Sequence, residues 1–128
     1  MTPSTGPPTR RWSIEFYTSA EEGSPVEDFL EGLPFAAHVK LFNLIRLLEE
    51  QGVGLPFPYS SQVAGRLREL RSQLGKTHFR ILYAATPGRG FVLLHGFVKS
   101  TRRIPAGEIA VAQRRLDAYL GRQQLRGR

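Results

Sequence analysis

Eight cationic side chains gather in the second half of the chain, within or beside three segments whose composition favours β-strands. They are Arg66, Arg68, Arg71, Lys76, Arg80, Lys99, Arg102 and Arg103. Pairing of the three strands brings these cations onto a small area. Cations held on strands can surround one phosphate and stabilise the charge that develops when a phosphodiester is cleaved. Arginine suits this role because its planar guanidinium binds phosphate bidentately and stays charged.

For such a cleavage, RNA supplies its own nucleophile, the 2′-hydroxyl. The protein then has to align this group, remove its proton and protonate the leaving oxygen. Histidine titrates in the right pH range, and the chain contains His38, His78 and His95. We take His95 as the first candidate for the base and His78 as its competitor, and we expect His38 at the surface. The alternative for His95 is a structural, hydrogen-bonded role, because it stands in an apolar strand.

The three cations that matter most also have simpler explanations. Arg80 could form an ion pair with Glu69, Arg71 could bind a helix carboxylate, and Lys99 could be a solvated charge at a strand end. For Arg80 we favour function, because an arginine within so apolar a strand tends to be placed for a partner. For Arg71 and Lys99 both explanations stay open.

The distribution of charge supports a polyanionic partner. The net charge is +7, but residues 1–50 carry four basic and eight acidic side chains, whereas residues 51–128 carry fourteen basic and three acidic. So strong a division suggests that the second half meets a polyanion and the first half does not. Nucleic acid is therefore favoured over a basic surface that serves solubility alone.

Several classes of protein are excluded by what the sequence lacks. It has no cysteine, which excludes disulfides, thiolate metal sites and cysteine nucleophiles. It has no GxxxxGK loop, no HExxH pair and no GxSxG elbow, and we expect neither a metal nor a cofactor. No apolar run is long enough to cross a bilayer, and the N-terminus lacks the layout of a secretory signal. We therefore expect a cytoplasmic protein without a membrane partner.

The N-terminal half predicts one strand followed by two helices. Residues 1–11 have the composition of a flexible tail, and residues 12–121 have the length of one domain. Apolar residues alternate from Trp12, which predicts a strand. A short helix begins at Ser24-Pro25 and ends at Gly32. A second helix runs from Pro34 to about Gln51, and Phe35, Val39, Phe42 and residues 44–48 supply the side that we expect to face the sheet.

The C-terminal half predicts three strands and a helix. After a loop at 52–65, the strands are 67–71, 78–85 and 91–99, and Leu67 and Leu70 break the alternation, which suggests a bulge, a twist or an edge. A helix from about 106 to 120 ends at Gly121, followed by a basic tail, 122–128. The expected fold is α+β with the order β-α-α-β-β-β-α. Its helices gather on one side of a mostly antiparallel, twisted sheet, and the other face stays partly open.

Four segments in a fixed order resemble one family of proteins. LRELR (67–71), FRILYA (79–84), LLHGFVKSTRRIP (93–105) and EIAVAQRRLDAY (108–119) are similar to the phage-derived Gp49-like branch of the RelE/HigB toxins. The resemblance covers roughly residues 12–119. It implies a RelE-like fold related to the microbial RNases, and the toxin of a type II toxin–antitoxin system.

The resemblance also implies an activity and partners. Family members act as metal-independent endoribonucleases (mRNA interferases) that cut messenger RNA in the ribosomal A site, and a cognate antitoxin, here a HigA-like helix-turn-helix protein, holds them inactive. The functional arginine of the family carries over to Arg80, and basic positions carry over to Arg71, Lys99 and either Arg102 or Arg103. We expect Arg66, Arg68 and Lys76 to bind RNA beside them.

The chain departs from the best-known members at two places, and other functions stay open. Those members carry lysines on the strand at 67–71, where this chain has Arg68 and Glu69, and a tyrosine where this chain has residues 104–107. Tyr119 lies too far along the last helix to replace it. One alternative is a ParE-like toxin that acts on DNA gyrase without cutting nucleic acid. Another is a phage accessory protein that binds nucleic acid without catalysis.

Overall fold

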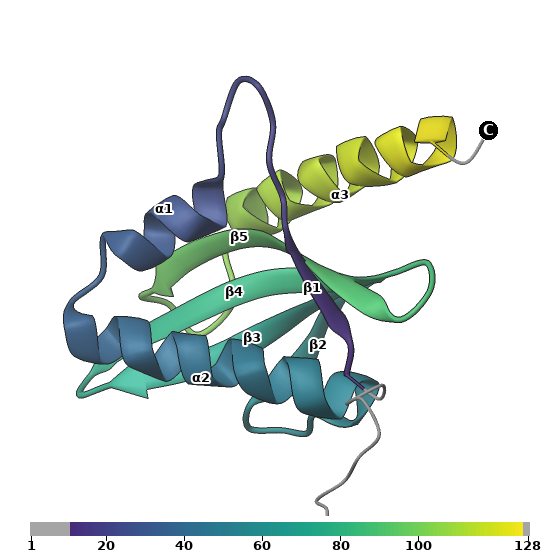
Figure 1. Ribbon diagram of the computed structural model, residues 1–128. Coiled ribbons are helices and arrows are strands. Elements are labelled where there is room, and N and C mark those ends of the chain that lie inside the picture. The colour runs from purple at the N-terminus through teal and green to yellow at the C-terminus, as the bar shows by residue number, and fades with distance from the viewer. Residues whose placement is uncertain (1–10, 127–128) are drawn as a thin grey trace, which may run out of the picture.

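A computed structural model describes residues 11–126, which form a five-stranded sheet with helices on both faces (Figure 1). Residues 1–10 of the predicted N-terminal tail lie outside the described residues. Residues 127–128 of the predicted basic tail lie outside them as well. The elements are β1 (Ser13–Phe16), α1 (Pro25–Glu31), α2 (Phe35–Gln51), the 3-10 helix η1 (Gly52–Gly54), β2 (Ser60–Ala64), β3 (Leu67–Leu74), β4 (Thr77–Thr86), β5 (Gly90–Lys99) and α3 (Ala106–Arg126).

The strand order in the sheet is β1-β5-β4-β3-β2. Only β1 pairs in parallel, with β5, and the other neighbours are antiparallel. The predicted α+β class and mostly antiparallel sheet are confirmed. The predicted loop at 52–65 is wrong in part, because it contains η1 and β2. β2 has the sequence SSQVA and lies at the sheet edge, where a polar strand is tolerated and gives no apolar period.

The sequence predicted that the helices gather on one side of the sheet, and this prediction is wrong. α1 and α2 pack on one face, on a core that includes Leu70, Ile81 and Leu93, whereas α3 packs on the opposite face (Figure 1). The core beneath α3 is built around Leu82 and Leu94. Strands buried on both faces give continuous apolar runs instead of alternation, which explains the composition of β4 and β5.

Two details of the helices also differ from the prediction. In α2 the buried side is Ala37, Leu41, Leu44, Ile45 and Leu48, while Phe35, Val39 and Phe42 are exposed. In α3 the predicted apolar stripe at Ile109, Ala112, Leu116 and Leu120 does face the sheet. However, the helix does not end at Gly121 but continues to Arg126, because glycine lowers helix stability without forcing a stop. No helix in the described part of the chain is long and apolar enough to cross a membrane.

A bulge in β5 decides which way His95 points. Leu82 is paired with His95 and Tyr83 with Leu93, so that Leu94 is an extra residue on β5. Plain alternation from Leu94 would place His95 on the face of α1 and α2. The bulge instead places it on the face of α3. The irregularity predicted at Leu67 lies on its partner strand, where the pairing of β2 with β3 shifts register between Gln62 and Ala64.

Packing beside Gly96 gives a test of the fold. A Cβ atom at Gly96 would lie 2.3 Å from Cδ2 of Phe29 on α1. We expect Gly96→Ala to lower the free energy of unfolding by about 1–3 kcal/mol, the usual cost of overpacking. Nothing lies within 4 Å of the corresponding position at Gly121, so Gly121→Ala should raise it by about 0.5–1 kcal/mol. Urea denaturation of both variants measures the difference, and equal stabilities would contradict the packing of α1 on β5.

Candidate functional site: a cationic face on β3, β4 and β5

Strand register brings four of the basic or titratable side chains onto one face of the sheet. Arg80 is paired with Arg71 on one side and with Phe97 on the other, and His78 is paired with Lys99. Residues directly opposite one another in antiparallel strands share a face, and Phe97 belongs to the core beneath α3. α3 packs mainly on β5 and β4, so the side of this face toward β3 stays open. We call Arg71, His78, Arg80 and Lys99 the cationic face.

A single buried carboxylate, that of Glu69, lies among these cations. Glu69 is 6% exposed. Its Oε2 accepts hydrogen bonds from Ser61 Oγ at 2.5 Å and from Arg71 Nη1 at 3.0 Å. Its Oε1 lies 3.0 Å from Nε of Arg80, which makes an ion pair without the alignment of a hydrogen bond. The alternative explanation of Arg80, a pair with Glu69, is therefore present in the structure, and Arg80 also donates from Nη1 to the carbonyl of Phe79.

The cationic face carries more positive charge than Glu69 neutralises. Arg80 is 3% exposed, and this burial is the main cause that lowers its pKa, with the charge of Arg71 adding to it and Glu69 opposing it. The pKa of Lys99 is also lowered, first by burial and then by the positive charge of Arg80, while Glu69 opposes the shift and Arg71 adds to it. These cations repel one another in the free protein, and a bound anion would relieve the repulsion.

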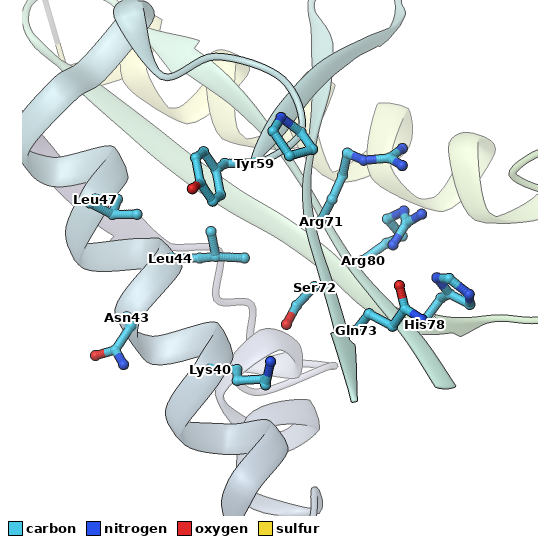
Figure 2. A pocket seen from close by; sticks show the side chains of 11 residues that line it. Lys40, Asn43, Leu44, Leu47, Tyr59, Arg71, Ser72, Gln73, His78 and Arg80 are labelled. Carbon is cyan, nitrogen blue, oxygen red and sulfur yellow. The ribbon is translucent and has the colours of Figure 1, made fainter. Parts of the chain in front are cut away.

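A groove of about 460 Å³ opens beside the cationic face, between β3 and α2. Its lining consists of Lys40, Asn43, Leu44, Leu47, Pro58, Tyr59, Arg71, Ser72, Gln73, His78 and Arg80. Figure 2 shows Arg71, Arg80 and His78 on the side of β3 away from α2, and Ser72 and Leu44 on the side toward it. The guanidinium carbon of Arg71 also lies 5.0 Å from the ring centroid of Phe57, and 29% of the Arg71 side chain stays exposed.

Both ring nitrogens of His95 already have partners. Nε2 lies 2.6 Å from Oε1 of Glu108, and Nδ1 lies 3.3 Å from Nη1 of Arg115. Arg115 in turn donates to the carbonyl of Leu94 and to Glu22. This network ties α3 to β5 and gives His95 the structural role that the sequence left open. His78, by contrast, lines the groove next to Arg71 and Arg80.

The remaining predicted RNA-binding residues lie away from the cationic face. Arg68 donates to Ser60 Oγ, and Arg66 donates to the carbonyl of Ala85. Both line a second groove of about 310 Å³, together with Gln62 and Tyr83. Lys76 is exposed in the turn between β3 and β4, and the exposed arginines of the loop before α3 are Arg102 and Arg103. The structure therefore brings together Arg71, Arg80 and Lys99, but not the other five cations.

Sequence analysis missed the central place of Glu69 and the contribution of three neighbours. The spacing of Glu69 and Arg71 puts both on one face of a strand, and this signal could have been used. Ser61 and Phe57 had no such signal, because both lie within 52–65, the segment predicted as a loop, and nothing in the sequence distinguished Lys40 from the other cations. Among the described residues, no three histidine, cysteine or acidic side chains are close enough to hold a metal ion.

The charge balance of this face predicts opposite effects for two substitutions. Glu69→Gln leaves Arg80 buried beside an uncharged partner and should lower the free energy of unfolding by on the order of 3 kcal/mol. Lys99→Gln should leave it unchanged or raise it, because the lowered pKa means that the charge of Lys99 costs stability in the folded protein.

The pH dependence of stability provides the check on Lys99. The charge of Lys99 destabilises the folded protein at neutral pH. This destabilisation disappears as the pH rises through the lowered folded pKa toward the ordinary lysine value of 10.5. Any advantage of Lys99→Gln in urea denaturation should therefore shrink between neutral and strongly alkaline pH. A loss of stability in Lys99→Gln at neutral pH would show that the cations do not repel one another.

One family model matches this chain. It is described as phage-derived protein Gp49-like (DUF891), and the match spans residues 28–117. No curated protein matches the chain. The matched segment contains every residue of the cationic face as well as Glu69, and it covers 90 of the 128 residues. The resemblance found in the sequence is thereby confirmed, and the chain belongs to the Gp49-like family of phage-derived proteins, a RelE/HigB-like toxin family.

Proposed function

We propose that this protein is the toxin of a type II toxin–antitoxin pair and cuts messenger RNA on the ribosome. The observation that carries the proposal is the cationic face, where mutually repelling cations lie on an open part of the sheet beside a groove. Such an arrangement costs stability in the free protein. A phosphate group of RNA provides the opposite charge, and the membership of a toxin family gives the context.

The side chains can be assigned to the steps of a transesterification. His78 accepts the proton of the 2′-hydroxyl, whose oxygen attacks phosphorus and forms a 2′,3′-cyclic phosphate. Arg71, whose side chain is 29% exposed, binds the phosphate oxygens, and Arg80 adds positive charge from its buried position. Lys99 protonates the leaving 5′ oxygen, a role that its lowered pKa favours.

The partner that keeps such a toxin inactive should complement the cationic face. We propose an antitoxin, of the HigA-like helix-turn-helix type that the resemblance implies, that covers Arg71 and Lys99 with an acidic segment. Ribosome and messenger are the other partners, and they place the activity in the cytoplasm.

A toxin that acts without cutting is the second candidate, and two observations favour it. Arg80 is almost wholly buried, and His95 has no free ring nitrogen. Both reduce the number of side chains that can reach a reacting phosphate. A ParE-like inhibitor of DNA gyrase would need only the charge and shape of the cationic face.

Messenger cleavage can be measured by coupled in vitro translation, with the 5′ ends of the messenger mapped by primer extension. We expect cuts in the A-site codon that require ribosomes. Lys99→Gln, which removes the general acid, and Arg71→Gln, which removes a charge-stabilising donor, should each reduce the cleavage rate roughly 100-fold. Arg126→Gln, which removes an exposed cation at the end of α3, should cut like the wild type.

Folding has to be controlled in this experiment, because Arg80 is buried. Arg80→Ala should abolish cleavage, but only circular dichroism or a denaturation curve can separate lost chemistry from lost structure. Intact messenger and normal translation with folded wild-type protein would reject the nuclease. Gyrase supercoiling would then test the second candidate.

A further inference from the structure

The groove does not end at the cationic face but continues around the edge of β3 to the side of α2 that faces this strand. Pairing between β2 and β3 reaches from Leu67 to Leu70, and one further backbone hydrogen bond joins Arg71 N to the carbonyl of Tyr59. Beyond this point, Ser72 stands at the strand edge toward α2 (Figure 2). The same groove is therefore lined by the cationic face on one side of β3 and by α2 on the other.

The lining under α2 differs in kind from the cationic face. It has an apolar floor of Leu44 and Leu47, the ring of Tyr59, and hydrogen-bonding groups from Asn43 and Ser72. Lys40 is the charged group on this side, and within residues 11–126 no carboxylate lines the groove. An aromatic ring, an apolar floor and a few polar groups suit a flat heterocycle, while the cations suit a phosphate attached to it.

We propose that the part of the groove under α2 binds the base of a single-stranded RNA nucleotide whose phosphate lies on the cationic face. Tyr59 and the leucine floor hold the ring of the base, Asn43 and Ser72 bond to its edge, and Lys40 contacts the neighbouring phosphate. The proposal rests on the proposed function and adds to it a substrate subsite. Contacts with the edge of the base give the enzyme a sequence preference next to the cut.

An acidic peptide is the other polyanion that the cations could attract. The lining favours the nucleotide, because Tyr59, which is 45% exposed, and the two leucines give an apolar surface that an acidic side chain does not use. The experiment below makes the peptide one of its outcomes.

Binding can be measured without the ribosome, by titrating ¹⁵N-labelled full-length protein and following amide shifts. The probes are the four ribonucleoside 3′-monophosphates, inorganic phosphate and hexaglutamate. We expect at least one nucleotide to bind about tenfold more tightly than inorganic phosphate and to shift the amides of Asn43 and Ser72. Tyr59→Leu should weaken nucleotide binding about tenfold and leave the affinity for inorganic phosphate unchanged.

A matched pair of substitutions on α2 separates the subsite from general charge. Lys40→Gln and Arg46→Gln each remove one exposed cation from the same helix, but only Lys40 lines the groove. With a dinucleotide that also carries a 3′-phosphate, so that a second phosphate can reach Lys40, Lys40→Gln should weaken binding several-fold, and Arg46→Gln should not change it.

In the titrations, the subsite is overturned by equal affinity for nucleotides and inorganic phosphate, by shifts confined to the cationic face, or by hexaglutamate binding in the groove more tightly than any nucleotide. If messenger is cut but Tyr59→Leu changes neither binding nor the preferred cut sites, the subsite fails and the nuclease stands. If nucleotides bind as expected but no messenger is cut, the nuclease fails and the subsite stands.

Discussion

The carboxylate of Glu69 holds the cationic face together. It is buried. One of its oxygens accepts hydrogen bonds from Arg71 and Ser61, and the other forms an ion pair with Arg80. Without a carboxylate there, Arg80 would be a buried cation beside Arg71 on the neighbouring strand, and its hydrogen bond to the carbonyl of Phe79 would not offset the desolvation cost. With it, two guanidinium groups share one negative charge, and the excess of positive charge stays on the open side of the face. The geometry of the site therefore follows from one ion-pair cluster between neighbouring strands.

The sheet determines which side chains can join this cluster. Because side chains alternate along a strand, Glu69 and Arg71 share a face while Arg68 lies on the other and bonds to Ser60. The bulge at Leu94 interrupts the alternation of side chains along β5 and turns His95 toward α3. There Glu108 and Arg115 contact its two ring nitrogens. Two side chains close together on β5 thus have different roles. Lys99 belongs to the open cationic face, whereas His95 takes part in the packing of α3.

Much of the fold could be predicted from the sequence, because β4 and β5 are long apolar runs joined by a turn and the helices have apolar stripes. β2 could not, since a polar edge strand has no such period, and the position of α3 could not, since continuous apolar runs do not say which helix covers which face. In the site, strand pairing predicted that all eight cations meet, and Arg71, Arg80 and Lys99 do so while the other five lie elsewhere. Strict alternation could also have separated Arg68 from them. The bulge that reorients His95 and the groove under α2 depend on tertiary packing, which leaves no local signal.

The most direct test of this account is where RNA binds. A short oligonucleotide with 2′-O-methyl groups cannot supply the 2′-hydroxyl nucleophile, so it allows binding to be mapped by amide shifts without cleavage. We expect shifts on β3, β4 and β5 around Arg71, His78 and Lys99, and none around the cations of α3 such as Arg114 and Arg122. Shifts centred on α3, or spread evenly over all basic residues, would show that the cationic face does not bind RNA.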